Sequence, residues 1–107
     1  MICRVWRAWT TKHNASAYQS VVRGEVIPGI EARRIPGFRA IGRVRRDREN
    51  DVEVMTSMWS STLDSVVEFM GEDYQAAHVP PQAQAVLTAF DHHSAHYELP
   101  GRREQPL

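Results

Sequence analysis

Residues 38–60, FRAIGRVRRDRENDVEVMTSMWS, carry the pattern from which the fold is predicted. Its residues alternate in character over 38–47 and again over 52–60, and a short polar segment, 48–51, joins the two runs. Two alternating runs around a short polar turn predict an antiparallel hairpin of two β-strands. The other elements of the chain are placed around this hairpin.

A further strand is predicted at the N-terminus, over residues 2–10, ICRVWRAWT, which contain no Gly or Pro. One face of this strand carries Cys3, Val5, Arg7 and Trp9, and the other carries Ile2, Arg4, Trp6 and Ala8. Both faces combine apolar bulk with an arginine, which favours a central strand buried on both sides. Each buried arginine then requires a partner.

Helical periodicity follows in three places. It predicts a helix over 13–27 with a kink or break at Pro28-Gly29, a second over 63–71 that ends at Gly71, and a third over 81–90. A short helical turn is predicted within 72–77, and the last strand over 95–99. The order is therefore strand, helix, strand, strand, helix, strand.

This βαββαβ order predicts an α+β, ferredoxin-like domain, with a four-stranded antiparallel sheet and helices on one face. We expect the domain to span residues 1–101 and a polar tail to span 102–107. The sheet face without helices is expected to be apolar and to pair with a second copy as a homodimer. Its expected residues are Ile2, Trp6, Ala8, Val54, Thr56 and Met58.

Composition narrows the partners and the setting. The 107 residues fit one domain, and the formal net charge is zero, which argues against a general nucleic-acid binder. Cys3 is the only cysteine, so a reducing cytoplasmic location is expected. No apolar run approaches the ~20 residues that cross a membrane, and no signal peptide is recognised.

Most common catalytic and metal motifs are missing from the sequence. It contains no GxGxxG, GxSxG or GxxxxGK pattern. His92, His93 and His96 lie close together, but no cysteine or carboxylate completes a zinc spacing. No metal site and no organic cofactor are expected.

Three segments, in order, carry a resemblance to a known family. They are Ile35-Pro36-Gly37-Phe38 after a helix, Met58-Trp59-Ser60-Ser61 at the end of a strand, and 73–78, DYQAAH. Over residues 2–99 the chain resembles the antibiotic-biosynthesis-monooxygenase-like superfamily of dimeric α+β barrels. The resemblance implies a cofactor-independent oxygenase for aromatic polyketides, a haem-degrading enzyme, or a protein without assigned activity.

The haem-degrading branch provides a comparison residue by residue. Its pocket uses an Asn on the first strand, a Trp at the end of the third strand, and a His after the second helix that ligates iron. Trp59 resembles that Trp and His78 resembles that His, whereas Arg7 occupies the Asn position. Haem is therefore kept as a third alternative.

The expected site lies in a cleft between sheet and helices. His78 is the expected general base, and Arg7 the stabiliser of an enolate; a surface His78 and an Arg7 paired with Glu98 or Glu53 remain the alternatives. Trp59 forms either the wall of the cleft or part of the core. The other expected substrate-binding residues are Trp9, Met55, Tyr74 and Tyr97.

Two functions are expected from different classes. The first is a small monooxygenase-like enzyme that acts on a hydrophobic, aromatic or polyketide-like molecule. The second is a non-catalytic dimer that binds a ligand or assists another protein. A cavity of a few hundred cubic ångströms that contains Arg7 and His78 favours the enzyme, and a filled core favours the second function.

Overall fold

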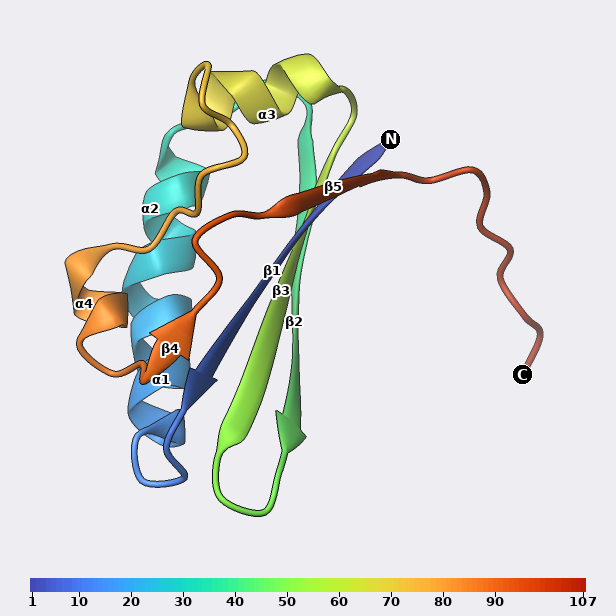
Figure 1. Cartoon of the computed structure of the whole chain (residues 1–107). Helices are drawn as coiled ribbons and strands as arrows, with labels where there is room; N and C mark the ends of the chain where they lie inside the picture. The colour runs from blue at the N-terminus through green and yellow to red at the C-terminus, as the bar shows by residue number, and fades with distance from the viewer.

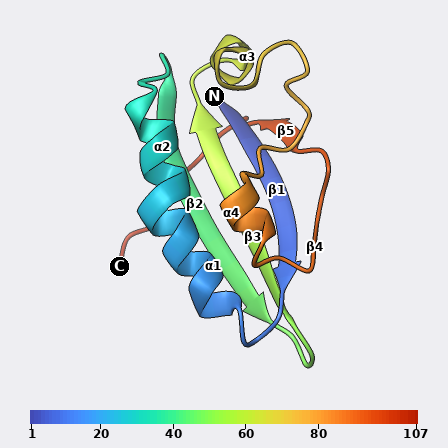
Figure 2. The ribbon, with the colours of Figure 1, turned by 90° about the vertical axis from the view of Figure 1, so that its left-hand side faces the viewer.

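The chain forms an antiparallel sheet with helices packed against one face. A computed structural model describes residues 1–107. The elements are β1 (Ile2–Thr10), α1 (Ala15–Val21), the π-helix η1 (Val22–Val26), α2 (Ile27–Ala32), β2 (Phe38–Asp47), β3 (Val52–Ser60), α3 (Leu63–Met70), α4 (Pro81–Gln84), β4 (Ala89–Phe90) and β5 (Ala95–Glu98). Helices α1, α2 and α4 lie on the same side of the sheet, and Figure 2 looks onto that side (Figures 1 and 2).

The predicted hairpin is confirmed. Strands β2 and β3 have the expected bounds and pair antiparallel, with Asp47 opposite Val52 next to the turn. β1 pairs antiparallel with β3 along its whole length, from Ile2 opposite Ser60 to Thr10 opposite Val52. The α+β class with an antiparallel sheet is therefore correct, and β1 is a central strand.

The sheet has five strands, and the prediction of four is wrong. The last strand is interrupted: β4 pairs with β1 at Ala8 and Trp9, and β5 pairs with residues 2–5 of β1. Between them the chain leaves β1 and joins the loop after α3. His92 O accepts from Ala77 N at 2.9 Å, and Ser94 N donates to Gln75 O at 2.7 Å. These competing backbone bonds divide the strand.

Two helix predictions are wrong in extent. The first helix is not broken at Pro28-Gly29, where the sequence predicts a kink or break; it continues through η1 into α2, and Pro28 occupies the first turn of α2, in which a missing N–H is tolerated. The predicted helix over 81–90 stops at Gln84. Thr88 then donates to Trp9 O and begins the β4 pairing.

None of the helices combines the length and the apolar character needed to cross a membrane.

The prediction of the uncovered sheet face is also wrong. Ala8, Val52 and Val54 pack with helix residues Ala15, Tyr18, Val22 and Ala83 in the main core cluster. Met58 packs in a second cluster with Ile30, Ile35 and Phe69. Because side chains alternate along a strand, the set from Ile2 to Met58 expected on the open face is the helix-covered set. Cys3, Val5, Arg7, Trp9, Met55 and Trp59 belong to the face that no helix covers.

Gly37 fixes the junction between α2 and the hairpin. Its φ is +82°, a conformation that favours glycine. A Cβ at this position would lie 2.1 Å from Ser65 Oγ on α3. The same residue accepts a backbone hydrogen bond from Ser61 at 2.8 Å. The turn Ile35-Pro36-Gly37 thus holds α3 close to the start of β2.

Candidate functional site

A small apolar cavity lies between the helices and the covered face of the sheet. It encloses about 70 Å³. Its apolar walls come from β1, β2, β3, the helical segment 18–30, α3 and the loop before α4, and its polar groups include Arg4, His78 and Ser94. The sheet and helix residues that line it include Trp6, Ile41, Met58, Tyr18, Val22, Val26, Ile30 and Phe69.

Arg4 is the charged group of this cavity, and it is only 5% exposed. Its Nη1 donates to Tyr74 O and to His96 Nε2, the latter at 3.0 Å, and its Nη2 donates to Ala76 O at 2.7 Å. No carboxylate lies within ion-pair distance of it. A guanidinium has more N–H donors than these three acceptors use, so donor capacity remains.

The surroundings of Arg4 disfavour its charge. Burial lowers the pKa of Arg4 to about 10, so the guanidinium is still protonated at neutral pH. The face of Phe69 gives some compensation, because the ring centroid lies 5.8 Å from Arg4 Cζ. Its acceptors are otherwise neutral groups. A ligand with a negatively charged oxygen would supply the missing opposite charge.

His78 lines the cavity and is itself exposed to solvent, which places it at the rim. Its ring meets Phe69 edge-on, with centroids 5.1 Å apart. Burial, followed by the charges of Arg33 and Arg4, lowers the pKa of His78 below its ordinary value. The imidazole is therefore neutral at pH 7 and has a free lone pair, the form that a general base requires.

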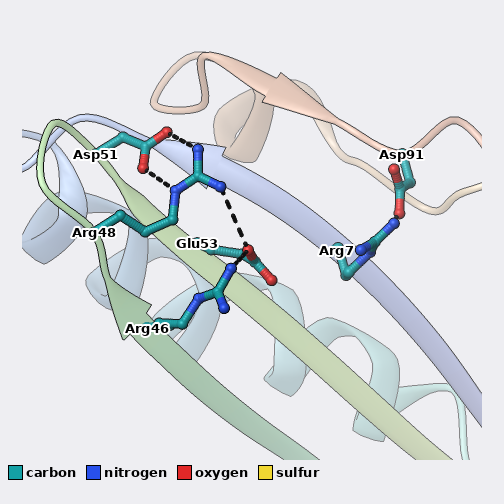
Figure 3. A network of polar contacts seen from close by, with 6 residues as sticks. All are labelled: Arg7, Arg46, Arg48, Asp51, Glu53 and Asp91. Carbon is teal, nitrogen blue, oxygen red and sulfur yellow. Dashed lines mark hydrogen bonds and ion pairs between the residues drawn. The ribbon is translucent and has the colours of Figure 1, made fainter.

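Arg7 does not enter this cavity, and the prediction that it does so is wrong. It lies on the open face, where its Nε is 3.2 Å from Asp91 Oδ2 and its side chain is 51% exposed (Figure 3). Its Cζ is 5.6 Å from the ring centroid of Trp9. The expected carboxylate partners, Glu53 and Glu98, are not used; Glu53 pairs with Arg46 and Arg48 (Figure 3).

The expected substrate-binding residues are divided between two places. Trp9, Met55 and Trp59 lie on the open face and do not line the cavity. Tyr74 and Tyr97 line a second hollow beside β5, which we call the outer depression; it encloses about 470 Å³. The remaining residues of the outer depression are Ile2, Leu63, Gln75, Ser94, Ala95, His96 and Glu98.

The two residues that resemble the haem-degrading branch do not share a site. Trp59 belongs to the open face of β3, and His78 lies on the helix side of the sheet. The cavity at His78 is also small for a porphyrin. The residues present therefore do not fit haem. No group of three or more His, Cys, Asp or Glu side chains is arranged to hold a metal ion.

Sequence reasoning missed Arg4, Ser94 and His96. Arg4 and Arg7 occupy equivalent positions on the two faces of β1, so only the placement of the helices identifies the buried one. Ser94 and His96 lie where the last strand is interrupted, which depends on contacts with the distant loop 75–77. No local pattern in the sequence carried that information.

No family model matches the chain, and no curated protein matches it at a significant level.

Proposed function

We propose that the protein binds a small, largely apolar molecule with one acidic oxygen in the cavity between helices and sheet, and oxidises it without an organic cofactor. The observation that carries this proposal is Arg4, a buried cation without a carboxylate partner at the wall of an apolar cavity. Such a charge is costly unless a ligand or a counter-ion balances it. His78 at the rim supplies a neutral base beside it.

The chemistry requires only a base and an anion stabiliser. His78 removes a proton from an acidic C–H or O–H of the substrate, and Arg4 stabilises the resulting enolate or phenolate. The electron-rich anion then reacts with dioxygen. In the balanced reaction a methylene group and dioxygen become a carbonyl group and water, and the substrate itself supplies the electrons.

The proposed family is the antibiotic-biosynthesis-monooxygenase-like superfamily, in its dimeric α+β barrel form. The sheet order supports it: β2-β3-β1, followed by β4 and β5 on the far side of β1, is the order of a ferredoxin-like sheet whose last strand is divided. The open face supports it as well. Val44 on that face is 58% exposed and lies opposite Met55 of β3, and the same face carries Trp59 of β3 and Val5 of β1.

A homodimer through the open face is tested by a charge at an exposed position. In a two-fold dimer the Glu of the Val44→Glu variant would face either the same Glu of the second copy or an apolar surface of that copy. Either arrangement is unfavourable, so the variant should not associate. Ser16→Glu, on the exposed surface of α1, is the matched control. Light scattering should give the mass of two chains for the wild type and the control, and of one chain for Val44→Glu. A wild type that is monomeric at high concentration would exclude the dimer.

A second function has a specific observation in its favour. The cavity of about 70 Å³ is well below the ~300–1,000 Å³ of ordinary ligand sites. Arg7, moreover, is ion-paired within the fold. Both findings favour the alternative of a non-catalytic protein that binds a ligand or assists another protein. The small volume also means that only a small apolar part of any substrate could enter the cavity.

Oxygen consumption separates the two functions. An oxygen electrode would follow turnover with a panel of phenols and aromatic ketones that carry an acidic C–H. We expect His78→Gln to lower kcat at least about a hundredfold, the size of general-base effects. His92→Gln, outside the cavity, should leave it unchanged. Binding without oxygen uptake by the wild type would assign the non-catalytic function, and equal rates in His78→Gln would remove His78 as the base.

A further inference from the structure

The outer depression and the cavity lie on two sides of the hydrogen bonds that Arg4 makes with Tyr74 and His96. Arg4 lines the cavity, and Tyr74 and His96 line the outer depression. Arg4 Nη1 contacts both, through Tyr74 O and His96 Nε2. Ser94 lines both hollows. His96 and Tyr74 thus contact the buried guanidinium and also line the outer depression.

His96 is a replaceable partner of Arg4. A guanidinium only donates hydrogen bonds, so His96 Nε2 must accept at 3.0 Å, and the imidazole must be neutral with its proton on Nδ1. The other two acceptors of Arg4 are backbone carbonyls of the loop 74–76. A carboxylate would add a full negative charge and two acceptor oxygens beside the guanidinium, in the bidentate pairing that arginine favours, whereas the neutral imidazole offers one uncharged acceptor. A carboxylate ligand would therefore improve on His96.

Glu98 favours a neutral hydrogen-bond donor at the end of the ligand opposite its carboxylate. It lines the same hollow and takes part in none of the ion pairs of the structure. It lies two residues beyond His96 on β5, on the same side of the strand. Two residues along a strand span about 7 Å. A para-substituted benzene ring separates its two substituents by a similar length. Glu98 repels a second anion and accepts from a hydroxyl group.

We propose that the outer depression binds a para-hydroxyaryl carboxylate, whose carboxylate replaces His96 on Arg4 and whose hydroxyl donates to Glu98. The ring would lie against the apolar atoms of Ile2, Leu63 and Tyr74, which line the hollow. The proposal concerns binding in a hollow beside the cavity. It does not require oxidation and can fail or succeed independently of the role of His78.

Three small probes test the chemistry of the site by calorimetry. 4-Hydroxybenzoate should bind. 4-Hydroxybenzamide, which has the same shape without the charge, should bind at least about tenfold more weakly, because its amide gives the guanidinium one neutral acceptor in place of a carboxylate. Benzoate, which lacks the hydroxyl, should bind about threefold to tenfold more weakly.

Variants of His96 locate the site. His96→Glu places a carboxylate of the protein on Arg4, so it should reduce the affinity for 4-hydroxybenzoate more than about tenfold while raising Tm. His96→Gln has a similar reach and a neutral acceptor, and it should stay within about threefold of the wild type. His13→Glu, on the exposed segment before α1, controls for the added charge and should change neither quantity.

Glu98→Gln gives a second, independent measurement that leaves Arg4 untouched. It should reduce the preference for 4-hydroxybenzoate over benzoate. Failure of 4-hydroxybenzoate to bind the wild type, equal affinity for acid and amide, or full binding by His96→Glu would each overturn the proposal. Loss of oxygen consumption in His78→Gln would not affect it.

Discussion

Arg4 and Arg7 lie three residues apart on β1, and the sheet separates them completely. Arg4 faces the helices, is 5% exposed, and is held by two backbone carbonyls and a neutral imidazole. Arg7 lies on the open face, where it forms a solvent-exposed ion pair with the carboxylate of Asp91. One is a buried charge without a counter-ion, and the other is an ordinary surface ion pair. The helix-covered face, although more buried, therefore holds the less satisfied charge and the better site for an anionic ligand.

Removing each arginine in turn gives the largest expected difference between the two faces. Arg4→Met keeps the apolar stem but leaves Tyr74 O and Ala76 O without their donor, so unfolding in urea should show a loss of about 3 kcal/mol. Arg7→Met removes an exposed ion pair and should cost less than about 1 kcal/mol. Equal losses would mean that the two arginines do not differ as described.

The methionines of β3 repeat the comparison without charge. Met58 is 6% exposed and packs against Phe69, whereas Met55 lies on the open face. Met58→Ala should destabilise the chain by about 2–5 kcal/mol through the cavity that it leaves. Met55→Ala should have little effect on a dilute protein. If the open face binds a second copy, its effect should grow with protein concentration, because dimer formation then contributes to stability.

The smallest expected effect is a dependence on pH that arises on the helix side. Burial and the charge of Arg4 lower the pKa of both His78 and His96. The unfolded chain therefore binds more protons than the folded one once the pH falls below the ordinary histidine value of about 6.5, and stability should fall with it. Thermal unfolding between pH 7.5 and 5.5 should show a decrease in Tm that is smaller in His96→Gln. A Tm that rises on acidification would contradict these pKa directions.

The local elements were largely predictable from the sequence. The alternation in 38–60 gives the hairpin and its bounds, because a two-residue period and a polar turn are local properties. Which face of the sheet the helices cover is a different matter. Cys3, Val5 and Trp9 are as apolar as Ile2, Trp6 and Ala8, so the strand itself does not decide. An available hint was size: Ala8 lies opposite Ala15 and Ala83 in the core, where small residues let the helices approach the sheet.

The same ambiguity led to the wrong arginine in the predicted site. His78 lines the cavity, but the arginine that lines it is Arg4 and not Arg7. A shift of one position in face assignment moves every side chain of a strand to the other side, so one mistake displaced Arg7, Trp9, Met55 and Trp59 together. The division of the last strand could not be anticipated either, because it depends on a bridge between Ala76 and His93.

The pairing of β1 has a consequence for biosynthesis. β1 precedes the other four strands of the sheet along the chain, but one of its edges is completed only by β4 and β5, whose residues lie 80 or more positions after their partners in β1. The hairpin of β2 and β3 can pair with β1 as soon as residue 60 has emerged. Until the last strands arrive, the other edge of β1 presents unpaired N–H and C=O groups that other chains can join. A nascent chain stalled before β4 should therefore aggregate or require a chaperone, while synthesis of β4 and β5 closes the sheet.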